Sequence, residues 1–347
     1  MNFLILGAFE DGQTGLYIAD SIDQLKDGVR FIDIRLLLRL HKEKAQQIIL
    51  DKINGFDYTP DVILVLKGLE LTMDTLKKIR EKFPKAKLVN WFFDVYLGDK
   101  KIWEHTEYAE FIKMFDYFFC SLKGVADKLN ECGFDNAHYL DEACLVEAHE
   151  PQYMNNFQKK KYGEDISFCG SIGYIAHTNR IPILYKLLSE GFNVKIWGDI
   201  VTDAKSIPFD VRDALRGVPA VNEKHSMVCQ SSLINLGIDQ DPDLERSFSA
   251  RLYRVMCAGG LYLTTYTKGL EDMFKINKKG EPITEDQELV VFYDKDEDLV
   301  PICDFLLKND DIREVIAENG RVAVTNKHKF IDRIKEMKEV IEKNGNN

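Results

Sequence analysis

The sequence lacks the paired cysteines, the excess of positive charge and the long apolar segments that characterise several large classes of protein. Its seven cysteines are scattered singly, which is typical of reduced core thiols and argues against a disulfide framework or a zinc site. Lys and Arg number 46 against 57 Asp and Glu, and the net charge is −11. This charge excludes a general attraction to nucleic acid or anionic lipid, so any anion must be bound locally.

The sequence also shows neither a membrane-spanning segment nor a secretory signal. No segment approaches the roughly 20 consecutive apolar residues that cross a bilayer. The apolar opening, Met1–Gly7, stops at Glu10 and Asp11 and has no basic flank, so it is too short for a signal peptide. We therefore expect a cytoplasmic protein, and the 347 residues, 45% of them hydrophobic, are enough for two domains with separate cores.

Short apolar runs rich in Val, Ile and Phe alternate with stretches of helical period, which predicts βαβ units around parallel sheets. A polar stretch with one proline and three consecutive lysines, residues 150–163, interrupts the alternation and is interpreted as a solvated linker. Predicted strands before it are Phe3–Leu6, Phe31–Ile34, Val62–Leu66, Leu88–Phe92 and Tyr117–Cys120. Predicted strands after it are Ile166–Cys169, Val194–Trp197, Leu233–Leu236, Leu261–Thr264 and Leu289–Tyr293.

The two series of strands predict two Rossmann-like domains, residues 1–155 and 156–325. The chain has helical period from Asp296 onward, and its last segment, 326–347, is expected to form a C-terminal helix. An apolar stripe on this helix is typical of contact with a core, since the opposite face mixes charges of both signs. The stripe consists of Ile331, Ile334, Met337, and Val340 or Ile341.

Two features of the first half are candidates for ligand binding. The glycines of Gly7–Gly15, after the first predicted strand, would let backbone N–H groups approach an anion. The spacing fits neither GxGxxG nor a Walker loop, and a plain turn is the alternative. Asp94 follows a predicted buried strand, where the carboxyl end of a parallel strand faces a ligand. It is a candidate general base or acceptor-positioning group, with a helix N-cap as the alternative.

The second half offers two candidates for diphosphate binding. Gly170 and Ser171 form a turn after a predicted strand, and Arg180 at the next helix would supply positive charge; a structural turn is the alternative. Ser249 is expected to cap a helix that ends at Ala258.

Arg251 near the start of that helix would complete an anion seat with the free N–H groups. Arg254 lies three residues further and shares a face with Arg251. The alternative is surface ion pairing, chiefly for Arg246, with Asp239, Asp241, Asp243 and Glu245.

In their order along the chain these residues resemble the CgeB-like (spore-maturation) glycosyltransferases. The second domain of that family carries a Phe-x-Gly-Ser turn, an Arg, a Gly, and later Ser-x-Arg-x-Phe-Glu followed by Gly-Gly. The matching residues here are Phe168-Cys169-Gly170-Ser171, Arg180, Gly198, Ser249 through Arg254, and Gly259-Gly260. The first half is similar to the accompanying domain through Asp61–Gly68, Trp91-Phe92-Phe93-Asp94, Phe115-Asp116 and Gly133-Phe134. The resemblance therefore covers nearly the whole chain.

The resemblance implies an α/β protein with the GT-B fold, in which two Rossmann-like domains face each other across a cleft and the C-terminal helix crosses back to the first. It also implies transfer of a hexosyl or pentosyl group from a nucleoside-diphosphate sugar to an acceptor hydroxyl, without a metal or other cofactor, since basic residues and helix termini stabilise the leaving diphosphate. The implied catalytic residues are Asp94 and, as a second candidate, Glu10. The implied donor-binding residues are Gly170, Ser171, Arg180, Gly198, Ser249, Arg251 and Arg254.

One departure from the family and two alternatives bear on this prediction. Arg254 stands where related enzymes place the Glu that typically holds the ribose, so ribose recognition must be altered or supplied elsewhere. The acceptor is open among a glycan, a protein, a lipid-linked sugar and a modified DNA base, and the net acidity argues against DNA. A catalytically silent protein that binds a nucleotide sugar is the remaining alternative.

Overall fold

The chain folds as two compact units. The computed structural model describes residues 1–97, 100–173 and 179–345. The first unit combines Met1–Asp141 with Phe330–Asn347, and the second is Glu142–Lys329. The chain leaves the first unit before the stretch 150–163 that the sequence analysis interprets as the linker, and returns to it at Phe330.

Among the described residues of the first unit, six parallel strands form a sheet in the order β2-β1-β3-β4-β7-β8. All five residues of β3 are buried, which is typical of a parallel strand with both faces covered. In register, the last residue of β3, Leu66, lies beside Trp91 of β4. The strands are β1 Asn2–Gly7, β2 Gly28–Asp33, β3 Val62–Leu66, β4 Lys87–Phe92, β7 Tyr117–Cys120 and β8 Ala137–Tyr139.

Helices connect these strands, and two of them begin at side chains that accept a backbone N–H. Asp33 at the end of β2 caps α2, and Thr72 caps α4. After β4 the strands β5 (Tyr96–Leu97) and β6 (Lys100–Lys101) pair antiparallel. The helices are α1 Thr14–Gln24, α2 Ile34–His41, α3 Ala45–Asn54, α4 Met73–Lys82, α5 Ala109–Lys113 and α6 Lys123–Glu131, with 3₁₀ turns at Lys42–Lys44, Ile102–Glu104 and Thr106–Tyr108.

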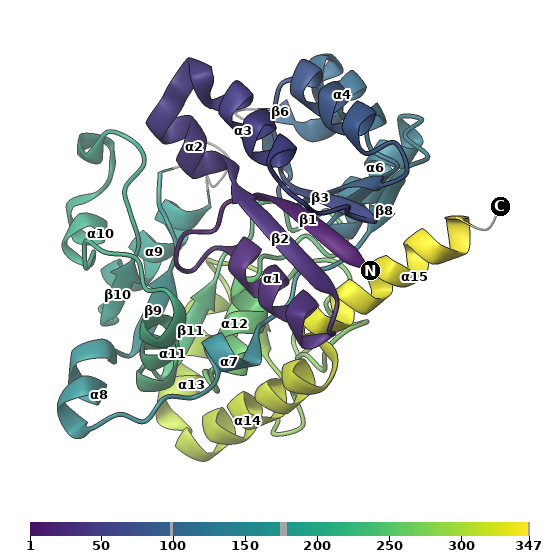
Figure 1. The fold of residues 1–347 in the computed structure, drawn as a ribbon. Coiled ribbons are helices and arrows are strands. Elements are labelled where there is room, and N and C mark those ends of the chain that lie inside the picture. Colours follow the sequence, from purple (N-terminus) through teal and green to yellow (C-terminus); the bar gives the residue numbers. More distant parts are fainter. Residues whose placement is uncertain (98–99, 174–178, 346–347) are drawn as a thin grey trace. The chain divides into compact units, whose positions relative to one another are not determined.

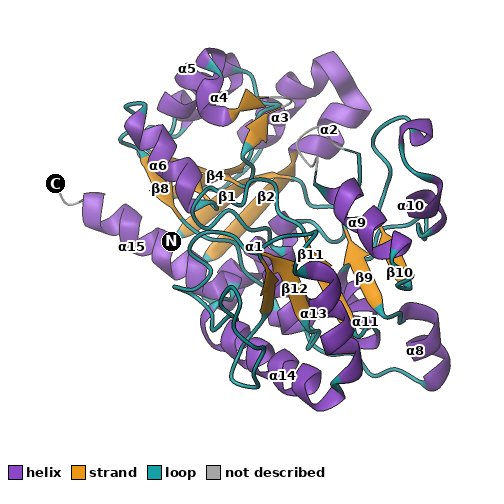
Figure 2. Ribbon diagram, turned by 180° about the vertical axis from the view of Figure 1, so that it is seen from behind, coloured by secondary structure: helices purple, strands orange, loops and turns teal. Residues whose placement is uncertain are grey.

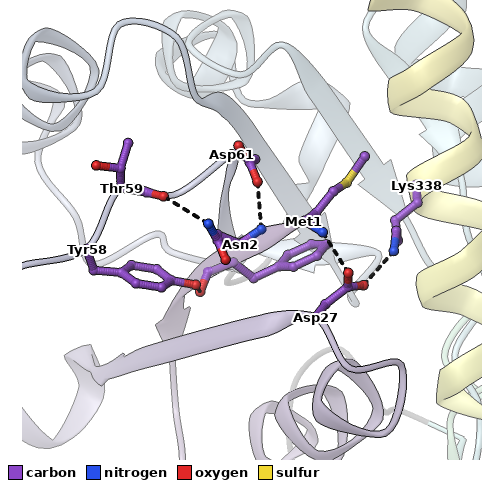
Figure 3. A network of polar contacts seen from close by, with 8 residues as sticks. Met1, Asn2, Asp27, Tyr58, Thr59, Asp61 and Lys338 are labelled. Carbon is purple, nitrogen blue, oxygen red and sulfur yellow. Dashed lines mark hydrogen bonds and ion pairs between the residues drawn. The ribbon is translucent and has the colours of Figure 1, made fainter.

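The C-terminal helix α15 (Phe330–Gly345) completes the first unit and packs beside α1 (Figure 1). Its predicted apolar stripe is buried at Ile334, Met337 and Ile341. The Lys338 ammonium lies 2.5 Å from an Asp27 carboxylate oxygen between α1 and β2, and the Met1 amino group reaches the other oxygen at 2.6 Å (Figure 3). The last helix is therefore bound to this unit by both an apolar face and an ion pair.

The second unit contains a second parallel sheet, with its described strands in the order β10-β9-β11-β12-β13 (Figure 2). The strands are β9 Ile166–Cys169, β10 Val194–Trp197, β11 Ile234–Gly237, β12 Tyr262–Thr265 and β13 Val290–Phe292. The helices are α7 Val146–His149, α8 Asn156–Tyr162, α9 Arg180–Ser189, α10 Phe209–Asp213, α11 Asn222–Ser231, α12 Arg251–Cys257, α13 Leu299–Lys308 and α14 Asp310–Lys327, with a 3₁₀ turn at Ala204–Ser206.

The predicted strands agree closely with the observed ones, and two expectations are wrong. The stretch 150–163 is not a linker between the two units, because it lies inside the second unit and contains α8, which packs on α11. The short strand β8 is absent from the predicted series, because its three residues lie between turns and show no apolar run.

Candidate functional site

In the second unit, two glycine turns meet at the carboxyl ends of neighbouring strands. Gly170 follows β9 and donates its N–H to the Trp197 carbonyl of β10, at 3.0 Å. A Cβ on Gly198 would lie 2.1 Å from the Gly170 carbonyl oxygen, so no side chain fits between the turns. Such close backbone approach at the carboxyl edge of a parallel sheet is typical of ligand-binding turns in α/β proteins.

Arg251, at the start of α12, reaches the turn after β9. Its Nε donates to the Cys169 carbonyl at 2.6 Å, and its Nη1 to the Ser249 hydroxyl at 3.4 Å. A Cβ on Gly170 would lie 2.6 Å from Arg251 Nη2, so the missing side chain makes room for the guanidinium.

Arg180, at the start of α9, approaches the same turn, and its Nη1 donates to the Ser171 carbonyl at 2.7 Å. The guanidinium carbons of Arg180 and Arg251 lie 5.5 and 4.8 Å from the centre of the buried Phe168 ring. One aromatic ring thus contacts two cations, each within the range of a cation–π interaction. The predicted donor-binding residues Gly170, Ser171, Arg180, Gly198, Ser249 and Arg251 are therefore gathered at one edge of this sheet.

Ser249 is not the helix N-cap that the sequence analysis expects. The helix begins at Arg251, its N-cap position is occupied by Ala250, and no side chain caps it. The Ser249 N–H instead donates to an Asp239 carboxylate oxygen at 3.0 Å. Asp239, which follows β11, also forms a side-chain hydrogen bond with Ser249, and this long-range contact engages the hydroxyl that a cap would use.

The sequence did not identify Asp239 as part of a binding site. It is only 6% exposed, and burial raises the pKa of its carboxyl group while Arg251 and the Ser249 N–H oppose that rise. Its position two residues after a buried strand resembles that of Asp94, and this was the available sequence signal. Arg246, for which a local ion pair was the alternative, pairs with Asp272 at 3.4 Å.

Arg254, on the same helix as Arg251, adds its charge to two buried histidines. Burial, followed by the repulsion of Arg254, lowers the pKa of His149 to about 2. The same two causes lower the pKa of His225 to about 3. The two imidazole rings lie 6.4 Å apart. Both rings are therefore neutral beside the positively charged Arg254 guanidinium.

In the first unit, Asp94 and Lys67 form an ion pair beyond the carboxyl ends of β4 and β3. The Lys67 Nζ lies 2.5 Å from Asp94 Oδ2. Lys67 has a φ of 57°, in the left-handed region that a non-glycine residue seldom adopts. Its carbonyl accepts a hydrogen bond from the amide of the buried Asn90, at 2.9 Å, which holds this backbone in place. The alternative that Asp94 caps a helix is wrong, because the strand β5 follows it.

Lys67 also escaped the sequence analysis, because a single lysine after a strand carries no motif. Strained backbone at non-glycine residues is concentrated at functional sites in proteins, and here the ammonium group of the strained Lys67 lies beside the candidate base Asp94.

Glu10 lies in the loop between β1 and α1 and pairs with Arg39 of α2 at 2.5 Å. Both side chains are exposed, so this pair contributes little to stability. The loop itself is compact, since a Cβ on Gly15 would lie 2.3 Å from the Ala8 carbonyl oxygen and the Phe9 N–H donates to Asp33. Asp94 and Glu10 therefore belong to two different ion pairs.

Comparison with known proteins identifies this architecture. Residues 180–339 match the family described as glycosyl transferase-like. The sequence has no significant match among curated proteins. The catalytic domain of starch synthase IV from Arabidopsis thaliana, solved with ADP and acarbose, superposes with a TM-score of 0.69, at 10% identity and 99% coverage of both chains.

Two further structures resemble the chain over nearly its full length. An alpha-glucosyltransferase solved with UDP-glucose and DNA containing an abasic site has a TM-score of 0.67, at 12% identity and 99% coverage of both chains. A glycosyltransferase involved in avilamycin A biosynthesis has a TM-score of 0.59, at 10% identity, covering 98% of this chain and 96% of that chain. The chain thus has the two-domain α/β fold of GT-B glycosyltransferases, built on parallel sheets.

Proposed function

We propose that this protein transfers a hexosyl or pentosyl group from a nucleoside-diphosphate sugar to an acceptor hydroxyl, as a CgeB-like glycosyltransferase. The observation that carries the proposal is the pair of guanidiniums, Arg180 and Arg251, that contact Phe168 beside the Gly170-Ser171 turn. Two cations at the carboxyl edge of a sheet, in a protein of net charge −11, favour an anion as ligand.

The donor diphosphate is expected to bind at this edge of the second unit. Planar guanidiniums bind phosphate oxygens in a bidentate manner, and Ser249 and the turn residues supply further donors. Negative charge grows on the leaving diphosphate as the glycosidic bond breaks, so fixed cations stabilise the transition state more than the ground state. On this proposal the guanidiniums supply the charge compensation that a metal ion would otherwise provide.

The acceptor hydroxyl is expected to lose its proton to Asp94. The carboxylate is a third exposed, and Lys67 holds one of its oxygens at 2.5 Å, which leaves the other for a hydroxyl. Glu10 remains a second candidate on the acceptor side, although its ion pair with Arg39 is more exposed. We propose that the enzyme works in the cytoplasm on an acceptor such as a glycan, a protein or a lipid-linked sugar.

The proposal is tested by titrating the protein with UDP-, GDP-, ADP- and dTDP-sugars in thermal-shift and calorimetric experiments. A ligand at 100 times its Kd stabilises the folded state by about 2.7 kcal/mol, which a thermal shift detects. Replacing Arg251 with Ala should weaken the best donor at least about tenfold, because a charge-assisted hydrogen bond to phosphate is lost. Arg246→Ala is the matched control. Arg246 lies in the same segment as Arg251, but its guanidinium pairs with Asp272.

Two results would contradict the proposal in different ways. Unchanged affinity of the Arg251→Ala protein for every nucleotide sugar would show that the diphosphate does not bind at this site. Binding without slow hydrolysis of the donor, and without transfer to any acceptor in a glycan panel, would identify a sensor that binds nucleotide sugars and does not transfer them.

A further inference from the structure

A cluster of exposed aromatic and basic side chains lies on and beside α8. This helix is at the rim of the second unit (Figure 1). Tyr153 is 92% exposed and Phe157 is 74% exposed, more than any other large hydrophobic side chain in the described residues. Solvating side chains of this size is unfavourable, and exposed aromatic patches mark interaction surfaces. Together with the exposed lysines 159, 160 and 161, these residues are here called the α8 surface.

The segment that presents these side chains is fixed to the rest of the unit. Met154, between the two exposed aromatics, is buried, and its sulfur accepts a hydrogen bond from the Ser231 hydroxyl at 3.3 Å. The Gln152 N–H donates to the Gln230 side chain at 2.6 Å. At the other end of α8, Lys195 donates to the Gly163 carbonyl at 2.6 Å. The aromatics are therefore held outward by the fold and do not belong to a loose tether.

The charge of the α8 surface is opposite to that of the protein as a whole. Residues 151–163 include three lysines and no Asp or Glu, although the chain carries a net charge of −11. Lys160 and Lys161 follow Phe157 by three and four residues, so they share a face of the helix with it. Flexible lysine stems can lie along an apolar layer while their ammonium groups stay in the polar one.

We propose that the α8 surface binds the headgroup region of an anionic phospholipid bilayer. Aromatic rings at headgroup depth with lysines beside them are typical of peripheral membrane contact. A bilayer accepts separated aromatic side chains without a complementary pocket, which an acidic protein partner would have to supply. The contact is peripheral, since no helix in the described part of the chain is long and apolar enough to cross a bilayer. This inference is independent of the proposed sugar transfer.

The test is co-sedimentation of the full chain with vesicles of phosphatidylcholine alone and of phosphatidylcholine with about one third phosphatidylserine. We expect binding to the anionic vesicles at low salt, little binding to the neutral ones, and loss of binding as salt screens the lysines. Replacing lysines 159, 160 and 161 with Gln should lower the partition coefficient at least about tenfold, and Tyr153→Ser with Phe157→Ser should have a similar effect.

Matched controls come from exposed residues elsewhere on the chain. Lys77→Gln, Lys78→Gln and Lys85→Gln remove the same charge from the first unit, and Phe209→Ser removes another aromatic that is 70% exposed. These controls should bind vesicles as the natural sequence does. All variants should keep the same thermal midpoint, because each of the replaced side chains is exposed.

Three outcomes would overturn the inference. Absence of binding to anionic vesicles at low salt would contradict the inference directly. Equal loss in the variant of lysines 77, 78 and 85 would show that binding follows net charge and not this surface. Binding of polyglutamate by the α8 surface, with no vesicle binding, would identify an acidic protein as the partner.

Discussion

The buried histidines of the second unit predict a loss of stability in mild acid. Burial and the nearby Arg254 lower the pKa of His149 to about 2 and that of His225 to about 3, against 6.5 in an unfolded chain. A histidine with a lowered folded-state pKa stabilises the fold fully above the unfolded pKa. This contribution is lost as the pH falls below about 6.5, because the histidines of the unfolded chain then bind protons and those of the folded unit do not.

The magnitude follows from the difference between the two pKa values. Each unit of pH below the unfolded pKa costs 1.36 kcal/mol per group until the folded-state pKa is reached. Between pH 7.5 and pH 5.0, each histidine therefore removes about 2 kcal/mol from the free energy of unfolding, and the pair removes about 4 kcal/mol. Both folded-state pKa values lie well below 5, so this sum depends mainly on the unfolded pKa.

Urea unfolding at pH 7.5 and pH 5.0 provides the assay, with hydrogen exchange of peptides from α11 and α12 to follow the second unit alone. A His149→Gln, His225→Gln variant should lose about 4 kcal/mol less than the natural sequence over this interval, which separates the histidines from other titrating groups. A second measurement does not depend on that variant folding. The ring protons of His149 and His225 in nuclear magnetic resonance spectra should not titrate between pH 8 and pH 5, and titration near pH 6.5 would refute the reasoning.

Two substitutions probe the remaining candidate sites. Gly198→Ala places a methyl group against the Gly170 carbonyl oxygen. It should destabilise the second unit by about 1–3 kcal/mol, measured by thermal unfolding, and weaken donor binding, measured by titration. An unchanged thermal midpoint would mean that the two turns can separate without cost. Lys67→Met removes the partner of Asp94, so kcat/KM for the acceptor should fall at least about tenfold while donor affinity stays constant, with partial rescue by Lys67→Arg. An equal fall in donor affinity would place Lys67 outside the acceptor site.

Much of the fold could be predicted because parallel strands that are covered on both faces are encoded locally. Val62–Leu66 and Ile166–Cys169 coincide with the predicted strands, since each is an uninterrupted run of mainly apolar residues between turns. The C-terminal stripe at Ile334, Met337 and Ile341 is buried as its spacing predicts. In these segments the burial of side chains and the local pattern require the same structure.

The features that could not be predicted depend on contacts between distant parts of the chain. The helix α12 begins at Arg251, and Ser249 does not cap it, because both its N–H and its side chain bind the Asp239 carboxylate. The helix α8 begins at a local capping box of Asn155 and Gln158, and the buried Met154 just before it contacts Ser231 of α11. The residues around Asp239 and Ser231 do not mark these two as partners, so spacing alone does not reveal the contacts to Ser249 and Met154.

The charged groups around Phe168 support the proposal that this edge of the sheet binds an anionic ligand. Arg180 and Arg251 bring two cations to one ring, and Asp239 is the buried carboxylate that faces them. Burial raises the pKa of Asp239, which limits how much negative charge the protein itself supplies there. Two guanidiniums and one buried carboxylate thus lie near one another at this edge of the sheet. A bound diphosphate would add negative charge beside these guanidiniums, and we therefore expect donor binding to stabilise the second unit more than the first.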